Sequence, residues 1–110
     1  MIGFLSGTVV FSDGQDLILN TTSGVGYQIF CQQVLAEGSR ASRYISHVIK
    51  EASQELYGFS NLREKKLFEL LTTVKGVVPK SAYSMLANLG GENIITAVMM
   101  ENKALLKKAP

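Results

Sequence analysis

The chain has 110 residues, of which 46% are hydrophobic and 18% are charged, and its formal net charge is +2. This length suffices for one ordinary domain or two very small ones, and no apolar run approaches the roughly 18 residues of a membrane span. The first residues lack the basic start and the small-residue cleavage site of a signal peptide, so the sequence indicates a cytoplasmic protein without a membrane segment.

The single cysteine and the single histidine give no basis for a catalytic or metal centre. Cys31 has no second thiol to pair with, and it lies in an apolar and aromatic stretch that is typical of a strand, so we interpret it as a small buried residue. His47 has the same kind of surroundings. One cysteine and one histidine without nearby acidic partners do not make a zinc site, so we expect no metal, no cofactor and no catalytic residue.

The charge is distributed unevenly along the chain. Residues 1–62 carry three basic and five acidic side chains, a formal charge of −2, whereas residues 63–110 carry eight basic and four acidic ones, a charge of +4. The C-terminal half is therefore the one expected to face a polyanion. A solvated helical face can show the same excess, so charge alone does not identify nucleic acid as the partner.

The first 60 residues are rich in β-branched and aromatic side chains, and turn-forming residues interrupt them at short intervals. The pattern predicts five short strands, at residues 2–11, 16–22, 26–32, 43–50 and 54–59. Connections this short cannot hold the crossover of a parallel βαβ unit, so we expect antiparallel pairing. Closing the five strands into a small barrel removes their exposed edges and is the most economical arrangement.

The pattern changes at Asn61, after which apolar side chains recur at helical spacing. Asn61 with Glu64 three residues later forms the sequence of a capping box, so a first helix should begin here. It should end near Lys75 and Gly76, because Pro79 disfavours helix in the residue before it.

A second helix is expected from Pro79 or Lys80 toward Leu89, since proline is preferred in the first helical turn. Gly90 and Gly91 should end it, and further helices are predicted at about 93–100 and 104–106.

The segment from Gly76 to Lys80 joins the two helices and is the most informative feature of the chain. In such a hairpin the loop amides and the N-terminus of the second helix point outward, which suits a phosphate. The positive charge of Lys80 is unfavourable to the helix dipole but well placed for an arriving anion. An ordinary helical turn with a solvent-exposed lysine fits the segment equally well.

Several blocks of the sequence resemble RuvA, the bacterial Holliday-junction branch-migration family. The blocks are residues 1–7 (MIGFLSG), 24–27 (GVGY), 55–59 (ELYGF), and 67–68 (LF) followed by 76–80 (GVVPK). They occur in the family's order and spacing along the whole chain. The resemblance implies an α+β protein, with a five-stranded antiparallel OB-fold barrel over residues 1–62 and a helix-hairpin-helix domain over residues 63–110.

The resemblance also implies a non-enzymatic function: sequence-independent binding of four-way junctions by a homotetramer, as part of a branch-migration complex in homologous recombination and DNA repair. For the full-length protein, a RuvB-type ATPase would supply ATP hydrolysis and translocation, and a RuvC-type resolvase would be a further partner. Hairpin amides and lysines would take the DNA backbone. By position, the DNA-binding residues are Gly76, Val77, Val78, Pro79, Lys80, Lys50, Lys107 and Lys108, and an acidic loop at the junction centre falls at Glu51.

The chain departs from the family pattern at three places. Val78 stands where the family has a second glycine, and a β-branched residue is poor wherever φ must be positive or a phosphate must approach closely. Glu51 is followed by Ala52 instead of a second acid, which weakens the acidic loop unless Glu55 substitutes. Residues 105–110 match the lead-in to the family's second hairpin and end before its glycines, so we expect that hairpin to be truncated and the motor contact to be absent.

Two other functions fit parts of the sequence. A DNA glycosylase or lyase also uses a helix-hairpin-helix, but it needs an aspartate downstream of the hairpin, and Asp13 and Asp16 lie far upstream. A generic single-strand-binding or oligomerisation barrel would stack bases on exposed aromatic side chains. The aromatic residues available for this are Phe11, Tyr27, Phe30 and Tyr44, which could equally belong to the core.

Overall fold

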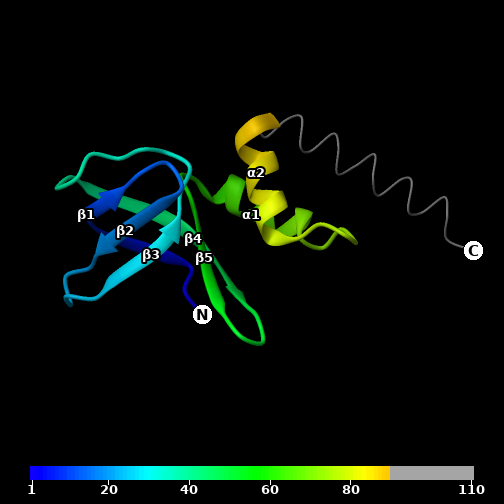
Figure 1. The fold of residues 1–110 in the computed structure, drawn as a ribbon, viewed down its shortest axis with the longest axis horizontal. Helices are drawn as coiled ribbons and strands as arrows, with labels where there is room; N and C mark the ends of the chain where they lie inside the picture. The colour runs from blue at the N-terminus through cyan, green and yellow to red at the C-terminus, as the bar shows by residue number, and fades with distance from the viewer. Residues whose placement is uncertain (90–110) are drawn as a thin grey trace, which may run out of the picture. The chain divides into compact units, whose positions relative to one another are not determined.

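The computed structural model describes residues 1–89, which form five strands followed by two helices (Figure 1). The elements are β1 (Phe4–Ser12), β2 (Asp16–Asn20), β3 (Gly26–Phe30), β4 (Arg40–Ile49), β5 (Gln54–Phe59), α1 (Leu62–Leu71) and α2 (Pro79–Leu89). By internal contacts these residues fall into two units, Met1–Lys65 and a second unit that begins at Lys66. The helices predicted beyond residue 90 lie outside the described residues. Within the described range, neither helix is long and apolar enough to cross a bilayer.

The five strands close into a barrel in the order β1-β2-β3-β5-β4, with β4 pairing back onto β1. The predicted five-stranded barrel is confirmed, and it is of the OB type. Four of the pairings are antiparallel, as predicted, but β3 and β5 are parallel, at Phe30 and Tyr57. A closed ring with an odd number of strands cannot alternate direction throughout, so one neighbouring pair has to be parallel.

A glycine allows this closure. A Cβ added at Gly58 would lie 2.9 Å from the Cγ2 atom of Ile29 and 3.4 Å from the carbonyl oxygen of Phe30. The first distance is shorter than carbon atoms tolerate, so β5 can approach β3 this closely only with glycine at position 58.

The barrel is filled by side chains that alternate along the strands. Leu17 and Leu19 are fully buried, whereas Ile18 between them is only half-buried, which is the two-residue period of a strand. The buried cluster consists of Val9, Leu17, Leu19, Ile29, Cys31 and Ile45. Cys31 is 2% exposed, so the interpretation of this thiol as a small core residue is confirmed.

His47 lies in β4, as the sequence indicated, and it ties the first residues of the chain to the barrel. Its Nδ1 atom accepts the backbone N–H of Ile2 at 3.1 Å. The Nε2 atom therefore carries the proton and donates to Oε1 of Gln54, at 2.8 Å. Both ring nitrogens thus have structural partners.

The strand bounds differ most from the prediction at the start of β4. The strand begins at Arg40, three residues before the predicted start at residue 43, because Arg40 and Ala41 pair with Thr8 and Gly7 of β1. Neither residue type favours a strand, so the pairing partner overrides local propensity here. At β2 the strand is shorter than predicted, since a turn closed by Thr21 and Val25 follows Asn20.

The predicted cap of the first helix is confirmed. Asn61 Oδ1 accepts the backbone N–H of Glu64 at 2.9 Å, and Asn61 Nδ2 donates to the Glu64 carboxylate at 3.0 Å. Regular helix ends at Leu71, earlier than predicted, because Thr72 and Thr73 turn their hydroxyls onto the carbonyls of the preceding turn. The chain then continues in tighter turns.

The second unit has an apolar core of its own. Leu71 and Val74 from the end of α1 and the turns after it are buried, and so is Ala82 of α2. The rings of Phe68 and Tyr83 meet edge to face, with centroids 6.2 Å apart. An edge-to-face pair of this kind stabilises by about 0.5–1.5 kcal/mol beyond the area it buries. The helices are therefore joined by packing as well as by the hairpin.

The cap at Asn61 can be tested directly. Replacing Asn61 with Ala removes the acceptor of the Glu64 N–H and should lower the free energy of unfolding by about 1 kcal/mol, measured by urea denaturation. Asn61→Ser keeps a capping oxygen and serves as the matched control, with most of the stability retained. Equal stability of the Ala variant and the native chain would show that this cap does not support α1.

Candidate nucleic-acid interface

The turn between the helices is built around Gly76. The Val77 N–H donates to the Val74 carbonyl at 3.1 Å, which closes a four-residue turn over residues 74–77. Gly76, the third residue of this turn, has a φ of +87°, the value that a type II turn requires there. A Cβ at Gly76 would meet nothing within 4 Å, so the backbone angle and not the available space requires glycine.

Helix α2 begins as the sequence predicted. The Ala82 N–H donates to the Val78 carbonyl at 3.0 Å, which makes Val78 the N-cap residue and Pro79 the first helical residue. The N–H groups of a first turn have no acceptor within their own helix, and the dipole gives this end partial positive charge. The Lys80 side chain, in the same turn, is exposed. Together these groups favour an anion at the start of α2.

A further cation lies in the same hairpin. Lys75 is the second residue of the turn that Gly76 completes, and its side chain is exposed. The sequence prediction of the DNA-binding residues began at Gly76 and did not include Lys75. Its position inside a four-residue turn was the signal that could have identified it.

Val78 is compatible with this backbone. Among residues 1–89, only glycines have positive φ, so the branched side chain of Val78 is not forced into a left-handed conformation. The side chain is nevertheless 57% exposed at the N-cap, where an anion would approach the amides. The backbone of this hairpin is thus formed without a second glycine, and a steric obstacle to the anion remains.

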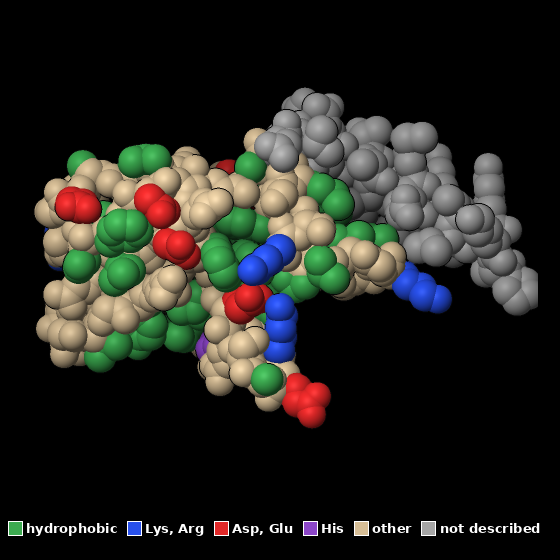
Figure 2. All heavy atoms as spheres, in the orientation of Figure 1, with side chains coloured by type: hydrophobic (Ala, Val, Ile, Leu, Met, Phe, Trp, Pro, Cys, Tyr) green, Lys and Arg blue, Asp and Glu red, His purple; other side chains and the backbone are tan. Residues whose placement is uncertain are grey.

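The loop between β4 and β5 is short and exposed. The strands pair as far as Ile49 and Gln54, and the Lys50 N–H donates to the Ser53 carbonyl at 2.8 Å, which leaves Glu51 and Ala52 at the tip. Figure 1 shows β4 and β5 continuing as a two-stranded ribbon beyond the body of the barrel. In Figure 2, acidic and basic side chains occur together on this ribbon.

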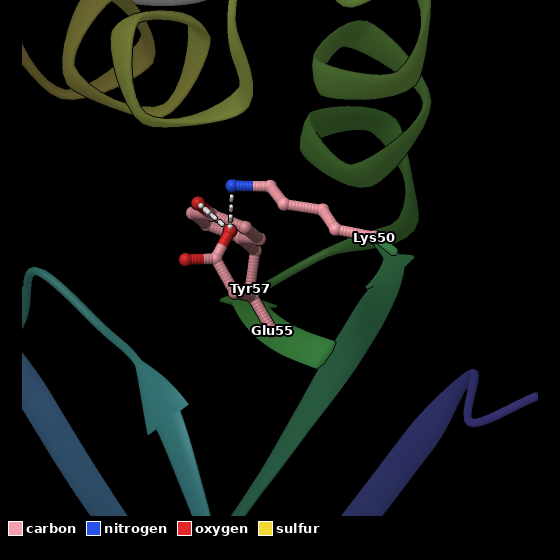
Figure 3. Close-up of polar contacts among 3 residues, drawn as sticks. All are labelled: Lys50, Glu55 and Tyr57. Atoms are coloured by element: carbon pink, nitrogen blue, oxygen red, sulfur yellow. Dashed lines mark hydrogen bonds and ion pairs between the residues drawn. The ribbon is translucent and has the colours of Figure 1, made fainter. Parts of the chain in front are cut away.

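An ion pair at the base of the loop uses the second acidic residue. Lys50 Nζ lies 2.9 Å from Oε1 of Glu55, and the hydroxyl of Tyr57 donates to the same oxygen at 3.1 Å (Figure 3). The Glu55 side chain is only 15% exposed and lies within β5. Glu55 therefore does not replace the missing acid at the tip of the loop.

The Tyr57 hydroxyl donates to the Glu55 carboxylate in this arrangement. Burial raises the pKa of Tyr57 well above its usual range, and the hydrogen bond to Glu55 and the negative charge of that carboxylate raise it further. The phenol is therefore protonated at neutral pH and can donate to Glu55.

The aromatic side chains of the barrel are mostly engaged with one another. Tyr44 packs edge to face on Phe4, with ring centroids 5.3 Å apart. The ring centroids of Phe30 and Tyr57 are 4.9 Å apart. Tyr27 packs against the buried cluster. Phe11 is the exposed member of the four stacking candidates, at 40%. These rings do not form a continuous exposed platform for bases.

The remaining predicted site residues, Lys107 and Lys108, lie outside the described residues. Within residues 1–89 no group of three or more histidine, cysteine or acidic side chains is arranged to hold a metal ion.

Comparison with known proteins identifies the family. Residues 1–58, more than half of the chain, match the family model described as the RuvA N terminal domain. The chain belongs to the RuvA family. Its OB-type barrel is therefore the N-terminal domain of a RuvA protein, and residues 24–27 and the start of the ELYGF block fall within the matched region.

Relatives of this RuvA chain align along nearly all of it. Each carries the name Holliday junction branch migration complex subunit RuvA. The protein of Brevibacillus brevis is 35% identical over 114 residues, covering 100% of this chain and 55% of the relative. That of Halothermothrix orenii is 32% identical over 111 residues (98% and 57%), and that of Acinetobacter baumannii strain SDF is 37% identical over 116 residues (100% and 57%). The chain thus spans about half the length of the curated relatives it matches.

The obstacle at Val78 leads to a prediction. Val78→Gly should raise duplex affinity several-fold, because removing the side chain opens the N-terminus of α2 to a phosphate. Glycine is a better N-cap than valine, so this substitution should not weaken the start of α2. The free energy of unfolding should therefore change by less than about 1 kcal/mol. Fluorescence anisotropy with labelled duplex measures the affinity, and Val78→Ile is the control that keeps the obstacle. Unchanged affinity of the glycine variant would mean that the amides do not contact DNA.

Proposed function

We propose that this chain binds four-way DNA junctions through their phosphate backbone, independently of sequence, as a DNA-binding and non-enzymatic subunit of a branch-migration complex in homologous recombination and DNA repair. The observation that carries the proposal is the hairpin of residues 74–80, in a chain of the RuvA family. Its turn leads into a helix N-terminus, with one exposed lysine in the turn, Lys75, and one in the first helical turn, Lys80.

Phosphate contacts suit this function for a physical reason. They fix the position of a protein on DNA but carry no sequence information, so a protein that holds a moving junction can keep its grip on any sequence. The proposed contacts are residues 76–80 together with Lys50, Lys107 and Lys108. Residues 76–80 can bind DNA of any base sequence, because backbone amides and a lysine both recognise the phosphate anion itself.

The acidic loop would give discrimination between DNA shapes. In a homotetramer, four copies of Glu51 around the symmetry axis would repel phosphates at the centre. A continuous duplex would bring phosphates onto these carboxylates, whereas an open junction leaves the centre vacant. One acid per subunit, with Ala52 beside it, makes this repulsion weaker than two adjacent acids would.

The proposal includes partners. In the full-length protein a RuvB-type ATPase would supply translocation, and a RuvC-type resolvase would act on the same junction. With chromosomal DNA as the ligand, we place this function in the cytoplasm.

The function is tested by comparing binding to a four-way junction, a duplex and a single strand at equal salt concentrations. We expect the junction to bind most tightly. Tightest binding to the single strand would instead favour a generic single-strand-binding barrel and would contradict the proposal.

Replacing Lys80 with Ala should weaken binding to junction and duplex alike, because a phosphate contact does not distinguish sequences. The slope of log affinity against log salt concentration should become shallower by about one unit. Lys80→Arg keeps the charge and is the matched control. Loss of binding for one base sequence only would contradict a phosphate contact.

Replacing Glu51 with Gln should raise affinity for duplex more than affinity for the junction, and the difference should shrink as salt screens the repulsion. Glu37→Gln removes the same charge from another exposed position of the first unit and serves as control. Light scattering should show that the assembly is unchanged. If duplex affinity stays the same or falls in an intact assembly, Glu51 is an ordinary solvated loop residue.

A further inference from the structure

The side chain of Lys50 is directed back along the hairpin and not toward its tip. Lys50 follows the last paired residue of β4, and Glu55 lies opposite Val48 on β5. The ammonium therefore crosses to the neighbouring strand to reach Glu55 Oε1 at 2.9 Å, as Figure 3 shows. A lysine next to an exposed loop has many other rotamers, so a specific acceptor is needed to select this one.

The acceptor is itself fixed. Glu55 and Tyr57 lie two residues apart on β5 and so share one face of the strand. The Tyr57 ring is 1% exposed and packs against Phe30, and its hydroxyl donates to the oxygen that Lys50 contacts. Exposed ion pairs are weak partly because two long side chains must be ordered together. Here one partner is already ordered by the barrel.

The pairing changes which charges the loop presents. Lys50, Glu51 and Glu55 are the ionisable groups of residues 50–55. Lys50 and Glu55 neutralise each other at the base of the loop, and Glu51 at the tip keeps its negative charge. Without the pair, a lysine adjacent to Glu51 would attract the same phosphates that Glu51 repels.

We propose that Glu55 is a positioning residue that restrains Lys50, so that a DNA phosphate has to displace the Glu55 carboxylate before Lys50 can contact it. This inference rests on the proposed DNA binding and refines it: Lys50 is a phosphate contact that an ion pair with Glu55 restrains. Glu55 thus affects discrimination without touching the DNA, by keeping the charge of the loop negative.

The test is a double-mutant cycle on the 110-residue chain, with Glu55→Gln, Lys50→Ala and the double variant. Glutamine keeps an acceptor for Tyr57 but not the charge that holds Lys50. Glu55→Gln should raise duplex affinity by about two- to fivefold, the range for an ion pair of this exposure. It should also steepen the salt slope by about one unit, because one more phosphate contact forms. Lys50→Ala should weaken binding more in the Glu55→Gln background than in the native chain.

Non-additivity separates restraint from simple repulsion. If Glu55 acts only by repelling DNA, its effect and that of Lys50 will add, and the gain from Glu55→Gln will survive in the Lys50→Ala background. That result would overturn the inference, as would a salt slope that falls by a full unit in Lys50→Ala alone. Glu37→Gln provides the same change of charge without an ion pair, and its effect should be additive with Lys50→Ala.

The cycle is measured on duplex and repeated on a four-way junction, so that the two hypotheses fail differently. Coupling between Lys50 and Glu55 without any preference for the junction would contradict the proposed function and leave the restraint of Lys50 standing. A clear junction preference with additive variants would contradict the restraint of Lys50 and leave the proposed function standing. Circular dichroism and thermal melting confirm that each variant is folded.

Discussion

The parallel contact between β3 and β5 is the constraint on which the barrel depends. Without it the five strands would form an open sheet with two unpaired edges. The buried cluster around Leu17, Leu19 and Ile29 would then be exposed to solvent on one side. The contact requires the absence of a side chain at Gly58 and is covered by the Phe30 and Tyr57 rings. It also fixes β5, and through β5 the hairpin that carries the acidic loop.

The helices and the hairpin between them could be predicted because their signals are encoded locally. The Asn61 cap, the proline at the start of α2 and the glycine of the hairpin turn each satisfy a backbone requirement within a few residues. The parallel pairing was not predicted from the residues, although the odd number of strands in a closed ring requires it. The early start of β4 was missed because its partner in β1 is about 30 residues away in the sequence.

The candidate site was predictable to a different degree in each unit. Residues 76–80 form one continuous hairpin, so their arrangement follows from the order of residue types. The role of Glu55 did not follow from sequence, where it was a possible substitute for an acid at position 52. The strand register turns its side chain toward Lys50 and Tyr57, and register depends on the pairing of whole strands.

The ring and the hydroxyl of Tyr57 make different contacts. Its ring belongs to the barrel closure, and its hydroxyl belongs to the charge arrangement of the loop. A phenylalanine at this position would keep the packing and remove only the donor, so the electrostatics of the loop can diverge among related chains by a single oxygen atom while the fold stays constant. The packing of the barrel and the electrostatics of the loop can therefore change separately at one residue.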